Sequence, residues 1–144
     1  MSKYLSHKTV VDGITFDSKD EAKYYEALKM RKYRGEIYNF ELQPKFVLRE
    51  AFEKFGKKYR AFTYTPDFAV YHNDGSVEYV DVKGQTTQQG EIRIKLFNDF
   101  YRDLKLSIVA RNLKYGDEYG FIDYYELQKI RRKNRRAKNE NNNR

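Results

Sequence analysis

The sequence contains no cysteine and only two histidines, His7 and His72. Without cysteine the chain forms neither disulfide bonds nor thiolate zinc sites, and such a composition is compatible with a reducing compartment. Two histidines are also too few for a zinc hydrolase. Sites built on sulfur or on clustered imidazoles are therefore excluded.

Long apolar runs are also missing. No stretch approaches the roughly 20 apolar residues of a membrane-spanning helix, and the opening MSKYLSHKTVV has no apolar core of signal-peptide length. We therefore expect a cytoplasmic protein with no membrane contact. With 40% hydrophobic and 17% aromatic residues the chain is not disordered, although 35% of it is charged. Its 144 residues suffice for one domain with a buried core.

The net charge of +8 is concentrated at the C-terminal end. Residues 129–144 hold eight Lys/Arg and one Glu, whereas residues 1–128 hold 21 Lys/Arg and 20 Asp/Glu. Such a run is either a solvated helix end or a contact with a polyanion such as nucleic acid. The side chains predicted to contact nucleic acid here are Arg131, Arg132, Lys133, Arg135 and Arg136.

Composition divides the chain into a main domain over residues 1–116 and a basic C-terminal extension over 117–144. The last six residues, NENNNR, are of low complexity and are predicted to be disordered. No internal repeat is visible.

The N-terminal half begins with a predicted hairpin over residues 10–16, with its turn at Asp12-Gly13. A helix follows over residues 17–35. Ser18 is its predicted N-cap, with Glu21 three residues later as in a capping box, and Gly35 ends it.

Further elements follow the changes in hydrophobic period. Strands are predicted at 45–50 and 58–64, around a basic connector at 51–58. A helix over 91–104 is expected to bury a stripe of apolar side chains, namely Ile92, Leu96 and Phe100. A short buried strand is predicted at 106–110. Helices and strands in this order favour a mixed sheet flanked by helices.

Residues 63–84, TYTPDFAVYHNDGSVEYVDVKG, predict a hairpin with charged residues inside its strands. Asp81 and Lys83 lie on one face of the second strand because side chains alternate. A loop of three residues with Gly75 in the left-handed conformation places Asp67 opposite Asp81. A two-residue loop would place Asp67 opposite Val82 on the apolar face, where a carboxylate is costly, so the first register is favoured.

Two carboxylates that face each other across a sheet repel. A divalent cation with oxygen ligands would relieve this repulsion, and Mg²⁺ is commonly bound by one or two carboxylates and a substrate phosphate. Lys83 would then orient a water or stabilise charge on the phosphate. The alternative is a surface hairpin in which Asp67 and Asp81 form a solvated charge cluster with Lys83.

The segments TPDF and DVKG resemble the two halves of the PD-(D/E)XK nuclease signature. The core of that superfamily runs α-β-β-β-α-β, and the resemblance covers roughly residues 10–110. VDGITFDSKDEAKYY and LQPKFVL are similar to segments of small phage-encoded nucleases related to Holliday-junction resolvases. The second half is Asp-x-Lys here, whereas many relatives have Glu-x-Lys, so the carboxylate is one methylene shorter.

The resemblance implies a restriction-endonuclease-like core and hydrolysis of DNA phosphodiester bonds with Mg²⁺, for which Mn²⁺ can substitute. The implied catalytic residues are Glu21, Asp67, Asp81 and Lys83, and the implied metal ligands are Asp67, Asp81, Glu21 and the carbonyl of Val82. Glu21 has an alternative role in the capping box. Lys95 matches the place of a basic residue that some relatives use near the scissile phosphate.

The partner implied is DNA, with a preference for branched DNA, and the protein is expected to be a homodimer in the cytoplasm of the host cell. Three alternatives stay open: a nuclease or nickase of loose specificity on duplex DNA, a non-catalytic DNA-binding protein with the same fold, and an RNA-binding structural protein. A histidine-based ββα-metal nuclease fits worse because its ligands and general base are missing.

Overall fold

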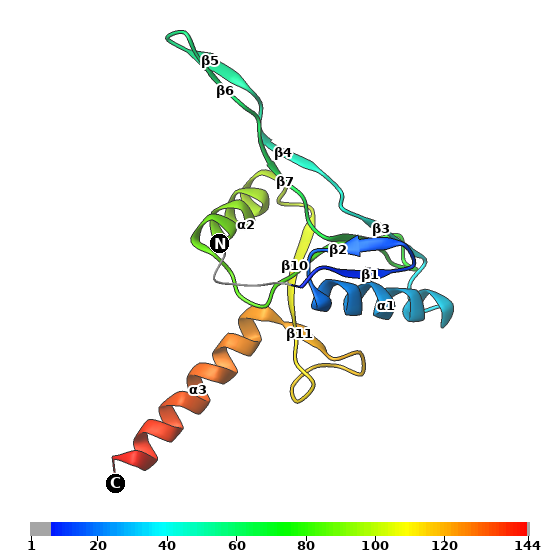
Figure 1. Ribbon diagram of the computed structural model, residues 1–144, viewed down its shortest axis with the longest axis vertical. Coiled ribbons are helices and arrows are strands. Elements are labelled where there is room, and N and C mark those ends of the chain that lie inside the picture. The colour runs from blue at the N-terminus through cyan, green and yellow to red at the C-terminus, as the bar shows by residue number, and fades with distance from the viewer. Residues whose placement is uncertain (1–6, 144) are drawn as a thin grey trace. The chain divides into compact units, whose positions relative to one another are not determined.

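The computed structural model describes residues 7–143, which form a mixed α/β structure with three helices and eleven strands (Figure 1). The helices are α1 (Lys19–Tyr33), α2 (Gln88–Phe100) and α3 (Tyr124–Asn142). The strands are β1 (Thr9–Val11), β2 (Ile14–Phe16), β3 (Asn39–Leu42), β4 (Phe46–Arg49), β5 (Phe52–Lys54), β6 (Lys57–Tyr59), β7 (Phe62–Tyr64), β8 (Phe68–Tyr71), β9 (Val77–Val82), β10 (Lys105–Arg111) and β11 (Phe121–Asp123).

The chain divides into two compact units, and the division passes through α1, β9 and β10. The first unit holds the chain up to Tyr24, together with Val82–Gly84 and the residues from Ile108 onward. The second unit holds Tyr25–Asp81 and Gln85–Ser107.

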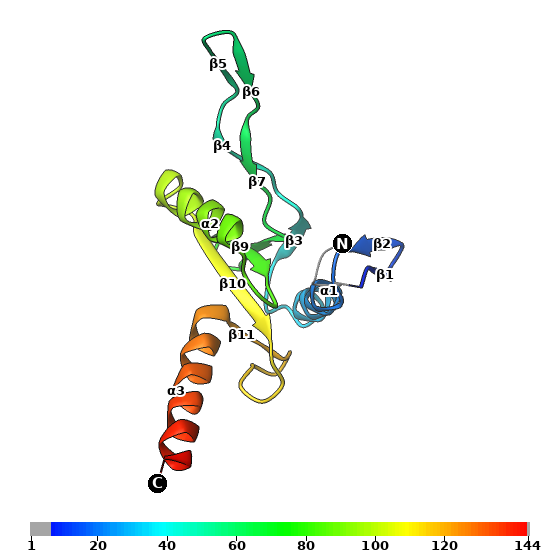
Figure 2. The same cartoon turned by 60° about the vertical axis from the view of Figure 1, so that its left-hand side comes forward.

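A five-stranded sheet has the strand order β11-β10-β9-β8-β3. Within the second unit, β8 pairs antiparallel with both β3 and β9. Within the first unit, β11 pairs antiparallel with β10. Two hydrogen bonds show that β9 and β10 run parallel. Ser107 donates to Glu78 near the starts of the two strands, and the Lys83 N–H donates to the Val109 carbonyl near their ends. Helix α2 makes the connection between them, as a parallel pair requires (Figure 2).

The core of the second unit centres on the buried Phe97 of α2. The ring of Phe46 lies edge-on to that of Phe97, with centroids 4.9 Å apart, and the ring of Tyr64 lies 5.6 Å from it. The prediction that α2 buries Ile92, Leu96 and Phe100 is wrong, since Ile92 and Phe100 are 50% and 58% exposed. This aromatic cluster decides which face of the helix is buried.

Several local predictions are confirmed. Strands β1 and β2 form the predicted hairpin, with positive φ at Asp12 and Gly13. Ser18 accepts a hydrogen bond from the Glu21 N–H at 3.1 Å, so it caps α1. Gly35 has a φ of 75° just after the helix, where a left-handed residue is favoured.

The region 39–64 differs from the prediction. Strand β3 was not predicted at all, and the segment 51–58 is not a connector. Its residues form β5 and β6, which pair as a second hairpin beyond the antiparallel pair β4 and β7. A single strand over 58–64 is likewise wrong, because β6 ends at Tyr59 and β7 begins at Phe62.

Strand β11 belongs to the sheet, and α3 continues the chain through Asn142. A domain division at residue 116 stays a prediction. Across residues 7–143, no helix combines the length and the apolar character needed to cross a membrane.

Candidate functional site

The β8–β9 hairpin has the register that the sequence favours. Phe68 pairs with Val80 and Tyr71 with Val77, so continuing the ladder by one residue sets Asp67 opposite Asp81. The loop is closed by a hydrogen bond from the His72 N–H to the Ser76 carbonyl at 2.9 Å. The two carboxylates therefore stand on facing positions of neighbouring chain segments.

Asp81 is the one buried charged residue in the described part of the chain, with 2% of its surface exposed. Its Oδ2 accepts a hydrogen bond of 2.7 Å from the Tyr64 hydroxyl, which comes from β7. Burial of an ionised carboxylate is costly unless it is hydrogen-bonded or paired with positive charge. The alternative of a solvated surface cluster is wrong for Asp81.

Asp67 lies half-buried at the bend before β8, directly after the buried Pro66. Its backbone carbonyl accepts a hydrogen bond from the Gln43 N–H at 2.9 Å. Gln43 itself has a φ of 52°, a left-handed conformation that few non-glycine residues adopt. The bend that carries Asp67 is thus fixed by the chain segment that follows β3.

Val82 and Lys83 belong to the first unit. Val82 is buried, and the Lys83 N–H donates to the Val109 carbonyl at 2.8 Å, which ties this end of the segment to β10. The side chain of Lys83 is half-buried. Lys83 follows directly after Val82, the last residue of β9.

Glu21 lies in the first turn of α1, within the first unit, and is half-buried. Further along α1, Tyr24, Tyr25 and Leu28 are buried, with 5%, 8% and 0% of their surfaces exposed. The backbone of Glu21 has the capping bond to Ser18. Both a capping and a catalytic role for its side chain stay open.

The residues predicted to contact nucleic acid are all exposed. Lys95 is on α2 in the second unit, and the others are on α3 in the first. Lys129, Arg132, Lys133 and Arg136 border one shallow groove along α3. This spacing of three and four residues gives the helix one continuous basic face.

Two contributors to the site are not among the site residues predicted from the sequence. Tyr64 binds the carboxylate of Asp81, and Gln43 holds the backbone of Asp67. Nothing in the sequence marks Tyr64, because its place depends on how β7 packs. Gln43 carries a weak signal, since it precedes Pro44 next to a strand end.

Over residues 7–143, no group of three or more His, Cys, Asp or Glu side chains is placed to hold a metal ion. A hard cation such as Mg²⁺ needs fewer, because it keeps waters and takes phosphate oxygens as ligands. Two facing carboxylates, one of them buried and oriented by a tyrosine hydroxyl, fit that donor set.

Comparison with known families gives a match that covers most of this chain. Residues 1–117 match the family described as "Protein of unknown function (DUF1064)". The matched region contains Glu21, Asp67, Asp81 and Lys83 and ends before β11 and α3. Among curated proteins, no sequence matches the chain significantly.

Proposed function

Because the chain belongs to the DUF1064 family of unknown function, we propose an activity from its own residues, that of a metal-dependent endodeoxyribonuclease of the PD-(D/E)XK type. The observation that carries the proposal is the pair formed by Asp67 and Asp81. They face each other across the hairpin, and Asp81 is buried against Tyr64. Carboxylates in this arrangement bind a cation well, and stability alone gives no reason to bring them together.

The order of elements supports the same proposal. Leaving aside β4 to β7, the chain runs α1, β3, β8, β9, α2 and β10, which is α-β-β-β-α-β. The four strands in this order, β3, β8, β9 and β10, all belong to one sheet. We infer that this is the restriction-endonuclease-like core, with α3 as its basic extension.

In the proposed site, Asp67 and Asp81 would hold Mg²⁺ through carboxylate oxygens, and the carbonyl of Val82 would be a further ligand. When bound, the ion polarises the phosphate and lowers the pKa of the attacking water. The ammonium of Lys83 positions that water or stabilises negative charge that develops on the phosphate. Tyr64 keeps Asp81 in one orientation, and Glu21 is assigned to orient waters or to bind a second ion.

The proposed substrate is DNA, with branched DNA preferred, cut by a homodimer. The rival proposals are a nuclease of loose specificity, a non-catalytic DNA-binding protein and an RNA-binding structural protein. Nicking of supercoiled plasmid with and without Mg²⁺ separates the nucleases from the other two.

The sharpest test changes the site residues one at a time. Asp67→Asn and Lys83→Ala are each expected to slow Mg²⁺-dependent nicking by more than about a hundredfold, because each removes a group that acts in the transition state. Tyr64→Phe is expected to have a smaller effect, because it removes only the bond that orients Asp81. Rates are measured on plasmid at saturating protein.

Matched controls are Asp17→Asn and Lys19→Ala, which change exposed residues of the same types. They are expected to nick at the unchanged rate. Circular dichroism and binding of DNA in EDTA establish that every variant folds. If Asp67→Asn or Lys83→Ala nicks like the unmodified protein, the proposed site is wrong.

A further inference from the structure

Strands β4 to β7 form a two-stranded ribbon, residues 46–64, here called the arm. Its base is β4 paired with β7, and its end is β5 paired with β6 (Figure 1). At the base, the Tyr101 hydroxyl donates to the Val47 carbonyl at 2.9 Å, and Arg93 donates to the Thr63 carbonyl. Both come from the α2 region, so the base is held in place.

The end of the arm packs against nothing in its own unit. Every residue from Arg49 to Ala61 is exposed. In both ribbon views β5 and β6 lie at the far end of the ribbon from α2 (Figures 1 and 2). An isolated hairpin is only marginally stable in water, so burial of a core does not explain why this segment is present.

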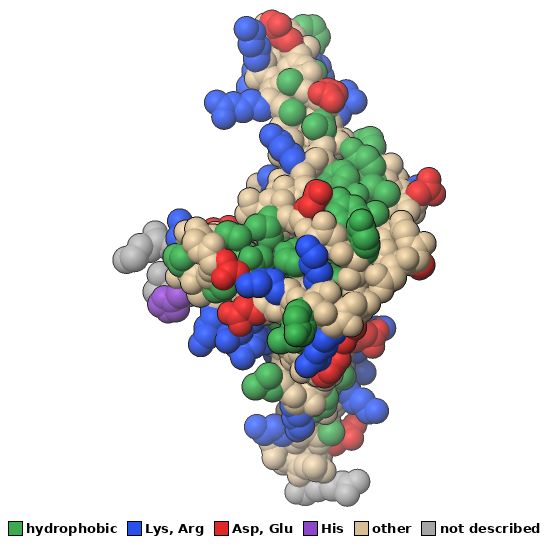
Figure 3. Space-filling view, turned by 90° about the vertical axis from the view of Figure 1, so that its right-hand side faces the viewer, with side chains coloured by type: hydrophobic (Ala, Val, Ile, Leu, Met, Phe, Trp, Pro, Cys, Tyr) green, Lys and Arg blue, Asp and Glu red, His purple; other side chains and the backbone are tan. Residues whose placement is uncertain are grey.

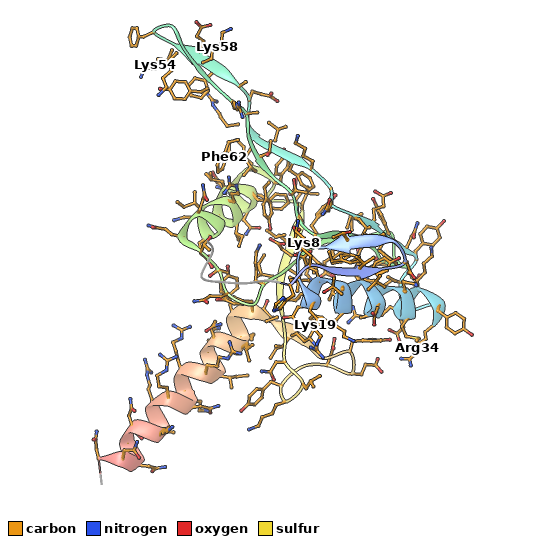
Figure 4. All side chains as sticks on the ribbon, viewed as in Figure 1. Lys8, Lys19, Arg34, Lys54, Lys58 and Phe62 are labelled. Carbon is orange, nitrogen blue, oxygen red and sulfur yellow. The ribbon has the colours of Figure 1, made fainter. Side chains whose placement is uncertain are left out.

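Within the first 128 residues, positive charge is concentrated on the arm. Residues 49–60 carry five Lys/Arg and two Glu, a net charge of +3, while the first 128 residues together have a net charge of only +1. Lys54 and Lys58 lie near the tip, and Phe62 lies nearer the base (Figure 4). In space-filling view, Lys/Arg side chains gather on this end beside hydrophobic ones (Figure 3).

Aromatic rings lie among these cations. The rings of Phe52 and Tyr59 stack with centroids 4.7 Å apart and planes 7° from parallel. Arg49 lies over the Phe52 ring at 5.6 Å, and Lys57 over the Tyr59 ring at 5.1 Å. Alternating cations and aromatic faces are the groups with which proteins bind phosphates and stack on bases.

The tip has a feature that folding alone opposes. Lys54 pairs with Lys57, so Phe55 and Gly56 form a two-residue turn, and both have positive φ. Such turns favour Asn or Asp at the first position, and a bulky residue with positive φ is strained. Phe55 has a φ of 47° and is 98% exposed, so burial of its ring does not offset this strain.

The charge favours a polyanion over an apolar protein partner as the occupant of this surface. A two-stranded ribbon fits the DNA major groove, which is about 12 Å wide. Apolar side chains of DNA-bending proteins enter between base steps and unstack them. An exposed phenylalanine at the tip of a basic ribbon matches that use.

We propose that the arm is a DNA-contacting ribbon, in which Lys54, Lys57 and Lys58 bind phosphates and Phe55 inserts against or between bases. The proposal deepens the proposed nuclease function by adding a contact with the substrate away from the carboxylate pair. It concerns binding alone, so it is tested in EDTA, where failure of catalysis has no effect on the result.

The test uses Phe55→Asn in the full chain. Asn suits the first turn position better than Phe, so the melting temperature is expected to stay the same or rise. Binding to duplex DNA, measured by fluorescence anisotropy, is expected to weaken about fivefold or more, because stacking on a base is removed. A 2-aminopurine base placed in the duplex becomes more fluorescent when it is unstacked. The unmodified protein is expected to increase this fluorescence, and Phe55→Asn is expected not to.

The charge contribution is tested by changing Lys54, Lys57 and Lys58 together to Gln. The slope of log affinity against log salt is expected to fall by about 0.9 for each phosphate that the protein no longer neutralises.

The control for Phe55→Asn is Tyr33→Asn, which removes another aromatic residue that is 88% exposed. This variant is expected to bind DNA normally.

Normal affinity and normal 2-aminopurine fluorescence in Phe55→Asn would overturn the proposal. Two other results would also overturn it. One is Phe55-dependent binding to phosphatidylcholine–phosphatidylglycerol vesicles without binding to DNA. The other is a dimer that dissociates in Phe55→Asn while DNA binding by the monomer is unchanged.

Discussion

Two carboxylates of β9 show how position decides the role of a residue. Asp81 is buried and bound by Tyr64. Glu78, three residues earlier, accepts a hydrogen bond from Ser107 and is hydrogen-bonded to His72 at 2.9 Å. Burial opposes ionisation of Glu78 and raises its pKa. The hydrogen bonds and the nearby charge of Lys105 outweigh burial, so the pKa of Glu78 lies below its ordinary value.

This lowered pKa gives a pH-dependent prediction for a single residue. A carboxylate whose pKa is lower in the folded state stabilises the fold above its unfolded pKa, and the stabilisation is lost as the pH falls through the folded value. Glu78→Gln is therefore expected to lower the free energy of unfolding at pH 7, with a smaller difference from the unmodified protein at pH 3. Urea denaturation at both pH values measures it.

The control for this prediction is Glu50→Gln, which changes an exposed glutamate. Its free energy of unfolding is expected to stay close to that of the unmodified protein at both pH values. A loss of stability in Glu78→Gln that is as large at pH 3 as at pH 7 would mean that Glu78 acts through packing rather than through its charge.

Among the secondary-structure elements, α3 combines a packed start with a long exposed remainder. Asp123 caps the helix by accepting hydrogen bonds from the N–H groups of Tyr125 and Glu126. Tyr124 and Leu127 are buried, whereas the side chains from Arg131 to Asn143 are exposed. The first turns anchor the helix, and its basic face is left for solvent or for a polyanion.

We predict that the basic side chains of α3, on this face and beside it, contact phosphates. Gln keeps helix propensity while removing charge, so the variant changes five residues of α3 to Gln: Arg131, Arg132, Lys133, Arg135 and Arg136. The salt slope of DNA binding is expected to fall by about 0.9 for each phosphate no longer bound, with little change in nicking rate at saturating DNA. Asn139→Gln in the same helix is the uncharged control. An unchanged slope would make α3 a solvated helix.

For the protein as a whole, the question is how a small chain chooses its substrate. The described residues hold no zinc site, and the sequence has no helix-turn-helix pattern for reading bases. For the proposed nuclease, selection by DNA shape is the remaining means. The cations of the arm and of α3 are suited to contact the phosphates of the DNA backbone. The path of that backbone depends on the shape of the DNA and carries no direct information about its sequence.

The corresponding prediction is that a four-way junction is cut faster than linear duplexes of the same arm sequences. A dimer presents two sites, which suits two strands that diverge at a junction. Cleavage is measured at one salt concentration near physiological, since non-specific binding conceals the contrast at low salt. Equal rates on junction and duplex would leave a nuclease of loose specificity and withdraw the preference for branched DNA.

Features that depend on neighbours in the chain could be predicted from the amino-acid sequence. The turn at Asp12-Gly13 and the cap at Ser18 follow from side chains and dihedral angles within a few residues. The register that sets Asp67 opposite Asp81 also follows locally, because loop length and alternation fix it. For this reason the central pair of the candidate site was predictable.

Which surfaces meet depends instead on packing between distant parts of the chain. Helix α2 buries Ile94 and Phe97 rather than Ile92 and Phe100, because the aromatic rings around Phe97 come from strands far away in the sequence. The hydrogen bond from Tyr64 to Asp81 likewise joins residues 17 positions apart in the sequence. The exposure of the arm also depends on the fold, because it follows from which strands the rest of the chain leaves uncovered. A helix with apolar residues on two sides has no local reason to prefer one, so the preference comes from the partner that packs against it.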